Sequence, residues 1–169
     1  MRYYLSIGSN IGNKLINLQK SIEMIYSLDD IKLLNVSDFI VTKPWGNTQQ
    51  DDFLNAIIEI DSSLEPELLL QECQAIEISM GREKNIKWGP RLIDIDIVFW
   101  IKDNVNMLYE SLNLIIPHQY MHTREFVLKP LCQLKPDLLH PKFNKTVREL
   151  YNSLKLSEII NKEDLKYDK

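Results

Sequence analysis

Apolar residues in the first part of the chain switch between an alternating period and a helical one. Residues 2–8 alternate apolar with small or polar side chains, which predicts a strand that ends in the turn-forming residues 8–10. Over residues 13–26 the apolar positions recur every three or four residues, which predicts a helix with one face in the core. The core face of this helix is expected to hold Leu15, Leu18, Ile22 and Ile25.

The next segment reads as two more strands and a second helix. Residues 31–41 and 53–60 are strand-like, although the alternation in the first of them is imperfect. A helix is expected from Pro66, a favoured first helical residue, to Met80, with Gly81 as the residue that ends it. Its core face is expected to hold Leu69, Cys73, Ile76 and Met80.

The remaining part begins with a strand and then becomes helical. Residues 92–100 predict a strand, with which a weaker extended segment at 107–116 is expected to pair. The chain looks helical after Pro117, and a last helix is expected over 146–154, followed by a charged tail that frays over 155–169. The buried positions expected in the first of these helical regions are Phe126, Val127, Leu128 and Leu131.

The order strand, helix, strand, strand, helix, strand is that of the split βαβ arrangement. It predicts an α+β, ferredoxin-like fold, in which an antiparallel sheet carries flanking helices. No repeat or linker interrupts residues 1–169, so we expect a single domain.

Composition and charge narrow the class of protein. The charged and hydrophobic fractions, 26% and 44%, are typical of a soluble globular chain. The net charge of −4 argues against a general nucleic-acid binder, and no apolar run has the length of a membrane span. The first residues already enter a strand pattern, so we expect no signal peptide. Cys73 and Cys132 form no CxxC pair, which favours reduced thiols and a cytoplasmic protein, although the two cysteines can still meet in space.

One segment reverses the acidic balance of the chain. Between positions 82 and 91 a single acid, Glu83, stands among the basic residues Arg82, Lys84, Lys87 and Arg91. Such a segment is either a solvated charged loop or a site for a polyanion of limited size.

The sequence LIDIDIVFW, Leu92 to Trp100, contains the most informative chemistry. Residues two apart in a strand share a face, so Asp94 and Asp96 point one way and the apolar residues Ile93, Ile95, Ile97 and Phe99 point the other. Two carboxylates with Cα atoms roughly 6.6 Å apart can converge on one or two divalent ions. Aspartate is depleted in strands, and paired like charges repel unless a cation lies between them, so we expect a metal site that suits Mg²⁺.

The residues before this strand favour a phosphate ligand. Gly89 and Pro90 predict a turn that brings Arg91 to the metal carboxylates, where a guanidinium can bind phosphate oxygens in a bidentate way. Trp88 either stacks on a flat ring of a ligand or packs as an ordinary apolar residue.

KWGPRLIDIDIV, Lys87 to Val98, resembles the signature of the 6-hydroxymethyl-7,8-dihydropterin pyrophosphokinases of the folate pathway. Three other segments are similar to parts of the same family: YLSIGSNIGN (Tyr4 to Asn13), PWGNTQQDDFLNA (Pro44 to Ala56) and IPHQYMHTREFVLKPL (Ile116 to Leu131). The resemblance implies transfer of pyrophosphate from ATP to the hydroxymethyl group of the pterin, with AMP as the second product, in tetrahydrofolate biosynthesis.

The resemblance also implies a role for particular residues. Asp94 and Asp96 would bind two Mg²⁺ ions, and Arg82 and Arg91 would stabilise charge on the transferred group. The implied ATP-binding residues are Gln74, Glu77, Lys84, Lys87, Trp88, Arg91, His118 and Arg124. The implied pterin-binding residues are Thr42, Lys43, Trp45, Phe53, Asn55, Trp88, Asp94 and Phe126, with Phe53 and Phe126 on either side of the ring.

Some positions depart from the family pattern. Phe53 stands where tyrosine is frequent, and Lys84 and Lys87 stand where arginine is common. Asn113 stands where a basic residue can help to bind the nucleotide. His118 and His122 are four residues apart, but Gln119 occupies the position at which a zinc HExxH motif needs glutamate, so we expect no zinc.

Two other functions remain open from the residues alone. A metal-dependent nucleotidyltransferase also uses paired aspartates, but it releases pyrophosphate instead of AMP. An RNA-binding module on a ferredoxin-like sheet needs exposed aromatic and basic residues across the sheet, whereas the strand at 92–100 carries two acids. The expected partners are small molecules, with no nucleic acid or membrane, and the expected state is a monomer.

Overall fold

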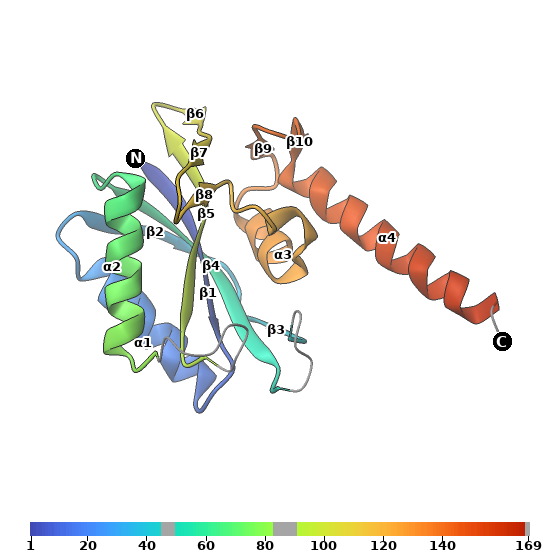
Figure 1. Ribbon diagram of the computed structural model, residues 1–169, viewed down its shortest axis with the longest axis horizontal. Coiled ribbons are helices and arrows are strands. Elements are labelled where there is room, and N and C mark those ends of the chain that lie inside the picture. Colours follow the sequence, from blue (N-terminus) through green and yellow to red (C-terminus); the bar gives the residue numbers. More distant parts are fainter. Residues whose placement is uncertain (45–49, 83–90, 168–169) are drawn as a thin grey trace.

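The computed structural model describes residues 1–44, 50–82 and 91–167, with the backbone alone from 158 onward (Figure 1). The elements of the first half are β1 (Arg2–Ser9), α1 (Lys14–Tyr26), β2 (Ile31–Val36), β3 (Ile40–Thr42), β4 (Phe53–Ser62) and α2 (Pro66–Ser79). The elements of the second half are β5 (Asp94–Lys102), β6 (Val105–Asn106), β7 (Tyr109–Glu110), β8 (Ile115–Ile116), η1 (Met121–Thr123), α3 (Glu125–Leu134), β9 (Leu139–His140), β10 (Lys145–Thr146) and α4 (Val147–Tyr167).

The main sheet has the strand order β2-β4-β1-β5-β6, and β3 pairs with β4 beside β2. All of these pairings are antiparallel. β1 lies at the centre and is buried from Tyr3 to Ser9, because β4 and β5 pair with its two edges. This strand order is that of the split βαβ unit, so the predicted α+β, ferredoxin-like fold is confirmed.

Different helices cover the two faces of the sheet. On one face the odd-numbered residues of β1, such as Tyr3 and Leu5, pack against the apolar stripes of α1 and α2. On the other face Tyr4, together with apolar residues of β4 and β5, packs against α3 and the start of α4. Figure 1 shows α1 and α2 on one side of the sheet and α3 on the other. The site described below lies on the face of α3, beyond the end of its apolar contacts.

The last helix departs from the sequence expectation. α4 begins one residue after the predicted start and continues to Tyr167, well beyond 154, so residues 155–167 of the tail are helical. Val147 and Leu150 are buried against α3 and its surroundings, whereas Leu156 is 60% exposed. In Figure 1 the later turns of α4 project away from the rest of the molecule.

Several other expectations need correction. Leu15 was expected in the core but is 45% exposed, because the buried stripe of α1 begins only at Leu18. The expected strand at 31–41 is two strands, since Ser37 interrupts the pairing and bonds both backbone groups of Ile57 through its own N–H and hydroxyl. The segment 107–116 was expected to pair with the strand at 92–100, but it folds back on itself as β7 and β8, while β6 pairs with β5.

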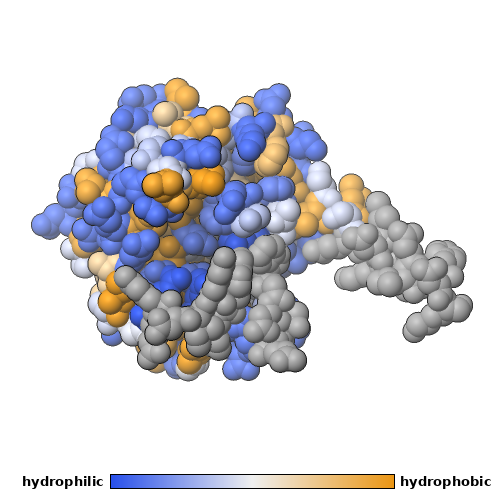
Figure 2. Space-filling model, viewed as in Figure 1, coloured by the Kyte–Doolittle hydropathy of each residue, from blue (hydrophilic) through white to orange (hydrophobic). Residues whose placement is uncertain are grey.

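Hydrophilic residues cover most of the face seen in Figure 2, and apolar ones are scattered over it. Scattered exposed apolar residues are ordinary for a folded domain. Within the described ranges, no helix is both long enough and apolar enough to cross a membrane.

Candidate active site

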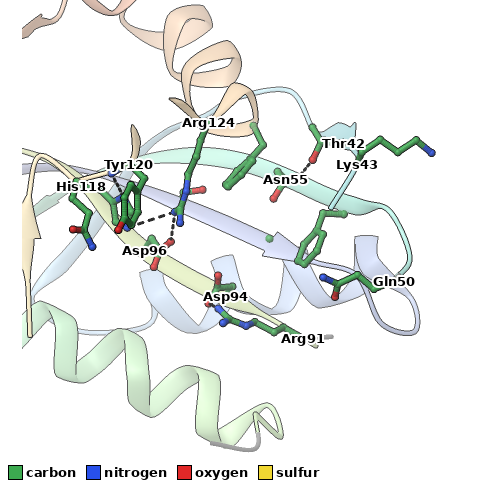
Figure 3. Close-up of a pocket in the computed structure, with 15 residues that line it drawn as sticks. Thr42, Lys43, Gln50, Asn55, Arg91, Asp94, Asp96, His118, Tyr120 and Arg124 are labelled. Atoms are coloured by element: carbon green, nitrogen blue, oxygen red, sulfur yellow. Dashed lines mark hydrogen bonds and ion pairs between the residues drawn. The ribbon is translucent and has the colours of Figure 1, made fainter. Parts of the chain in front are cut away.

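A cavity of about 370 Å³ opens on the face of the sheet that carries α3. Its walls come from the ends of β1, β4 and β5, from β3 and from the segment that leads into α3 (Figure 3). The lining residues are Ser6, Gly8, Thr42, Lys43, Gln50, Phe53, Asn55, Arg91, Asp94, Asp96, His118, Gln119, Tyr120, Arg124 and Phe126.

The two aspartates of β5 point into this cavity, as their alternation predicts. Ile95 and Ile97 are 4% and 2% exposed on the opposite face. Antiparallel pairing places Asp94 opposite Gly8 and Asp96 opposite Ser6, so small side chains of β1 leave room beside both carboxylates. The strand begins at Asp94, two residues later than predicted.

Three arginines surround the aspartates. Arg91 Nη1 lies 2.5 Å from Asp94 Oδ1, and Arg82 Nη1 lies 3.1 Å from the same oxygen. Arg124 Nη1 lies 3.4 Å from Asp96 Oδ2. Burial and the nearby Asp96 carboxylate raise the pKa of Asp94, against the opposing effect of Arg91 and Arg82. A site with two acids and three guanidinium groups has the donors and acceptors that a metal–phosphate complex requires.

Glu77 lies in α2 beneath this cluster and is 4% exposed. Its Oε1 accepts a hydrogen bond from the Ile95 N–H at 2.7 Å and pairs with Arg82. Burial and the Asp94 charge raise the pKa of Glu77 to about 7, although Arg82 acts in the opposite direction. The carboxylate predicted to face the nucleotide is thus turned toward β5 and Arg82, whereas Gln74, one turn earlier, is exposed.

His118 and Arg124 form the end of the cavity nearest to α3. His118 Nδ1 accepts the Tyr120 N–H at 3.2 Å. Burial and the Arg124 charge lower the pKa of His118 to about 4, so the ring is neutral at pH 7. Arg124 Nη1 lies 3.5 Å from His118 Nε2. Figure 3 shows His118, Tyr120 and Arg124 gathered around Asp96, and the guanidinium of Arg124 lies 5.6 Å from the Tyr120 ring centroid and 5.5 Å from that of Phe126. This end presents hydrogen-bond donors and positive charge.

The opposite end is aromatic and amide-rich. Asn55 is 4% exposed, and its Nδ2 donates to Thr42 Oγ1 at 2.8 Å. Phe53 lines the cavity at this end, and Phe126, whose ring lies beside the Arg124 guanidinium, lines it as well. These are the two rings that the resemblance assigns to the pterin. Lys43 points outward, with an 87% exposed side chain that pairs with Asp52 at 3.1 Å.

A second cavity of about 210 Å³ adjoins the first, since Asp96, His118 and Gln119 line both. The other residues that line it include Leu70 of α2, Ile97 of β5 and residues 111–115. Asn113, which departs from the family pattern, is among them. The end of the main cavity that holds Asp96 and His118 therefore continues into a pocket with mixed polar and apolar walls.

The structure brings together most of the residues that the sequence singled out. The cavity collects Thr42, Lys43, Phe53, Asn55, Arg91, Asp94, Asp96, His118, Arg124 and Phe126, and Arg82 lies beside it. Trp45, Lys84, Lys87 and Trp88 lie outside the described residues.

Five lining residues were missed: Ser6, Gly8, Gln50, Gln119 and Tyr120. The alternation of β1 offers a signal for Ser6 and Gly8, because both share a face of the sheet with the aspartates. Nothing in the sequence pattern marks the other three, whose positions depend on contacts between distant segments.

Comparison with known proteins agrees with the geometry. Residues 4–136 match the family model described as 7,8-dihydro-6-hydroxymethylpterin-pyrophosphokinase (HPPK). The chain is 41% identical to folic acid synthesis protein fol1 of Schizosaccharomyces pombe, over 94% of its own length but 22% of that protein. It is 40% identical to the 2-amino-4-hydroxy-6-hydroxymethyldihydropteridine pyrophosphokinase of Methylorubrum extorquens, over 94% of this chain and 96% of that one. It is 39% identical to the bifunctional protein FolKE of Lactococcus lactis, of which it spans 45%.

Solved structures support the fold. The chain superposes on the wild-type HPPK-DHPS of Plasmodium falciparum with pteroate with a TM-score of 0.66 and 17% identity, over 90% of this chain and 42% of that one. An HPPK-DHPS in complex with substrates gives a TM-score of 0.66 and 16% identity, over 90% and 43%. The family model and the sequence relatives confirm the family that the segment Lys87 to Val98 predicted. The chain belongs to the 7,8-dihydro-6-hydroxymethylpterin-pyrophosphokinase (HPPK) family.

Proposed function

We propose that this chain transfers pyrophosphate from MgATP to 6-hydroxymethyl-7,8-dihydropterin in the described cavity, giving the pterin diphosphate and AMP. One observation carries the proposal: a single cavity joins the cluster of Asp94, Asp96 and three arginines to a pocket with Phe53, Asn55 and Phe126. A phosphate donor and a flat heterocyclic acceptor each find suitable side chains there, next to each other in one space.

Asp94 and Asp96 would hold the metal, as two Mg²⁺ ions. Their hard carboxylate oxygens on one face of β5 fit Mg²⁺, which is usually bound by one or two carboxylates together with substrate phosphates and water. When bound, the ions would neutralise negative charge on the ATP phosphates. The metal would also favour the ionised form of Asp94, whose pKa burial raises.

Positive side chains would hold the phosphates. Arg82 and Arg91 lie next to Asp94 and would stabilise charge on the transferred group as the acceptor oxygen bonds to the β-phosphorus. The bond from that phosphorus to the oxygen that bridges it to the α-phosphorus breaks, AMP leaves with this oxygen, and the proton of the acceptor hydroxyl passes to solvent. His118 Nε2 and the Arg124 guanidinium would donate to phosphate oxygens, and Lys84 and Lys87 would add charge.

The base and ribose of ATP would extend into the adjoining cavity beside Leu70. Its link to the main cavity through Asp96 and His118 supports this direction, because the phosphates would lie at the shared residues. Gln74 and Glu77 on α2 stay predicted nucleotide residues; the contact that Glu77 makes with Arg82 supports an indirect role for it.

The pterin would lie between Phe53 and Phe126. Stacked aromatic rings and an edge-reading amide are what recognition of a flat heterocycle requires, and Asn55 supplies the amide. Thr42, Lys43 and Trp45 would border the ring edge, Trp88 would stack on a flat ring of a ligand, and Asp94 would reach the hydroxymethyl end.

We further propose that the chain acts as one domain, as a monomer and in the cytoplasm. Cys73 and Cys132 are free thiols, which suits a reducing compartment. Light scattering after size exclusion tests the monomer: a mass near 19.9 kDa is expected, and twice that mass would contradict it.

The decisive experiment is to mix the protein with ATP, Mg²⁺ and 6-hydroxymethyl-7,8-dihydropterin and to identify the products. AMP and the pterin diphosphate are expected, and pyrophosphate release would favour a nucleotidyltransferase instead. Asp96→Ala is expected to lower turnover by a factor of about 10³ or more, since metal-held charge stabilisation is lost. Asp137→Ala, at an 82% exposed side chain, is the matched control with full activity. An active, folded Asp96→Ala variant would refute the metal role.

A further inference from the structure

The turn between β1 and α1 contains a buried amide that contacts both flanks of the cavity. Asn10 is 2% exposed. Its Nδ2 donates to Gln50 Oε1 at 3.0 Å and to the Asp51 carbonyl at 3.4 Å. Its Oδ1 accepts the Arg91 N–H at 2.7 Å, and its own N–H donates to the Arg91 carbonyl at 3.1 Å.

These contacts fix the orientation of the amide. The Arg91 N–H can only donate and the Asp51 carbonyl can only accept, so Oδ1 must face Arg91 and Nδ2 must face residues 50–51. The oxygen of this planar amide therefore contacts Arg91, and its nitrogen contacts residues 50–51.

The two segments belong to different halves of the proposed site. Arg91 presents its guanidinium to Asp94, on the phosphate side. Gln50 lines the cavity and precedes Phe53, on the pterin side. The first residue of α1 makes a second contact with the pterin side, because Lys14 Nζ donates to the Asp52 carbonyl at 2.6 Å.

We propose that Asn10 is a positioning residue that couples the pterin half of the site to its nucleotide half; this rests on the proposed function. Asn10 can satisfy all of its partners only when residues 50–51 and Arg91 both lie against it. A ligand that fixes Arg91 through its phosphates also holds the Asn10 amide in the orientation that residues 50–51 need. The nucleotide therefore raises the affinity for the pterin, and the pterin raises the affinity for the nucleotide by the same factor.

The test measures the dissociation constant of 6-hydroxymethyl-7,8-dihydropterin by calorimetry, with and without a non-hydrolysable ATP analogue and Mg²⁺. The ratio of the two constants is the coupling factor. In the wild type it is expected to be about fivefold or more. Asn10→Ala removes all of the side-chain bonds, and its factor is expected to fall to within about twofold of one, which a loss of general stability would not cause.

A second variant and a matched control sharpen the result. Asn10→Asp keeps the acceptor for the Arg91 N–H but sets an oxygen against the Asp51 carbonyl, so it is also expected to lose coupling. Asn17→Ala is the control: Asn17 Nδ2 bonds Ser9 Oγ and the Ile11 carbonyl within the same turn. It should keep the wild-type factor.

Three outcomes would overturn the proposal: a wild-type factor of one, Asn10 variants that keep the full factor, or Asn10 variants that both fail to melt cooperatively, which would make the residue a structural one. AMP formation by the same wild-type preparation separates these outcomes from a failure of the proposed function. A chain that makes AMP without coupling refutes only the role of Asn10.

Discussion

Gly8 on β1 lies directly behind the amide that is proposed to read the pterin. A Cβ at this position would lie 2.6 Å from Asn55 Oδ1, closer than such atoms approach in proteins, and 3.7 Å from a carbon of the Phe53 ring. Any larger residue here would force the Asn55 amide, which bonds Thr42, to shift. The absence of a side chain here thus shapes the acceptor pocket.

Gly8→Ala is accordingly expected to damage one substrate site selectively. The new methyl group must push the Asn55 amide away from Thr42, which costs a hydrogen bond of about 1 kcal/mol and misplaces the recognition group. The KM for the pterin is expected to rise about tenfold, while the dissociation constant of an ATP analogue changes less than about twofold. Steady-state kinetics and calorimetry measure the two. An equal loss at both sites would mean that the substitution acts through the sheet as a whole.

At this scale the sequence predicts the residues that follow a period and misses those that depend on distant contacts. Asp94 and Asp96 could be placed because a strand alternates. For Asn10 the sequence predicts only a turn, because its hydrogen-bond partners are 40 and 81 positions away. The resemblance implies that Glu77 faces the nucleotide, and the helical period does not show that its carboxylate contacts Arg82 and the Ile95 N–H.

Among the elements, α4 differs most from its predicted form. The apolar spacing of its start predicts a helix, but nothing in the charged sequence beyond 154 marks where the helix ends. The short strands β6, β7 and β8 escape prediction for a related reason, because two residues are too few to establish a period. The long elements β1, β4, α1 and α2 were placed well, since each carries a sustained pattern.

The stability of α4 is expected to reside in its first two turns. Leu150 is 7% exposed in the cluster with α3, so Leu150→Ala leaves a cavity and is expected to lower the free energy of unfolding by about 2–4 kcal/mol. Leu156→Ala makes the same chemical change at a 60% exposed position and is expected to cost less than about 0.5 kcal/mol. Urea denaturation of both variants measures the difference. Equal costs would show that the packing of α4 is not concentrated at its start.

For the whole molecule, the site follows from how the faces of the sheet are covered. α1 and α2 close one face along its length, whereas α3 and the start of α4 close only part of the other. The uncovered part lies where Gly8 of β1 pairs with Asn55 of β4 and with Asp94 of β5. The polar side chains of these neighbouring strands therefore lie close together. The order of elements predicts the sheet, but it does not predict how far α3 reaches across it, because that depends on side-chain packing.

A buried histidine packs against the apolar residues on the α3 face of the sheet, and its charge state matters for the whole fold. His140 is 3% exposed, its ring centroid lies 4.5 Å from that of Phe143, and its Nδ1 accepts the Lys142 N–H at 3.2 Å. Burial and the positive charges of His122 and Lys142 lower the pKa of His140 to about 4. The neutral ring is therefore the form that the fold accommodates.

The stability of the protein should consequently decline in mild acid. An unfolded histidine titrates near a pKa of about 6.5, so between that pH and about 4 the unfolded chain binds more protons at His140 than the folded one. The free energy of unfolding should fall as the pH drops through this window and should not depend on His140 above it. His140→Asn keeps an acceptor at the position of Nδ1 but cannot titrate, so its loss of stability between pH 7.5 and pH 4.5 should be smaller than that of the wild type. Urea denaturation of both proteins at the two pH values measures this difference. The other titrating groups, His118 among them, are present in both proteins, so their contributions to the pH dependence largely cancel. Identical losses in the two proteins would show that His140 is protonated without cost in the folded state.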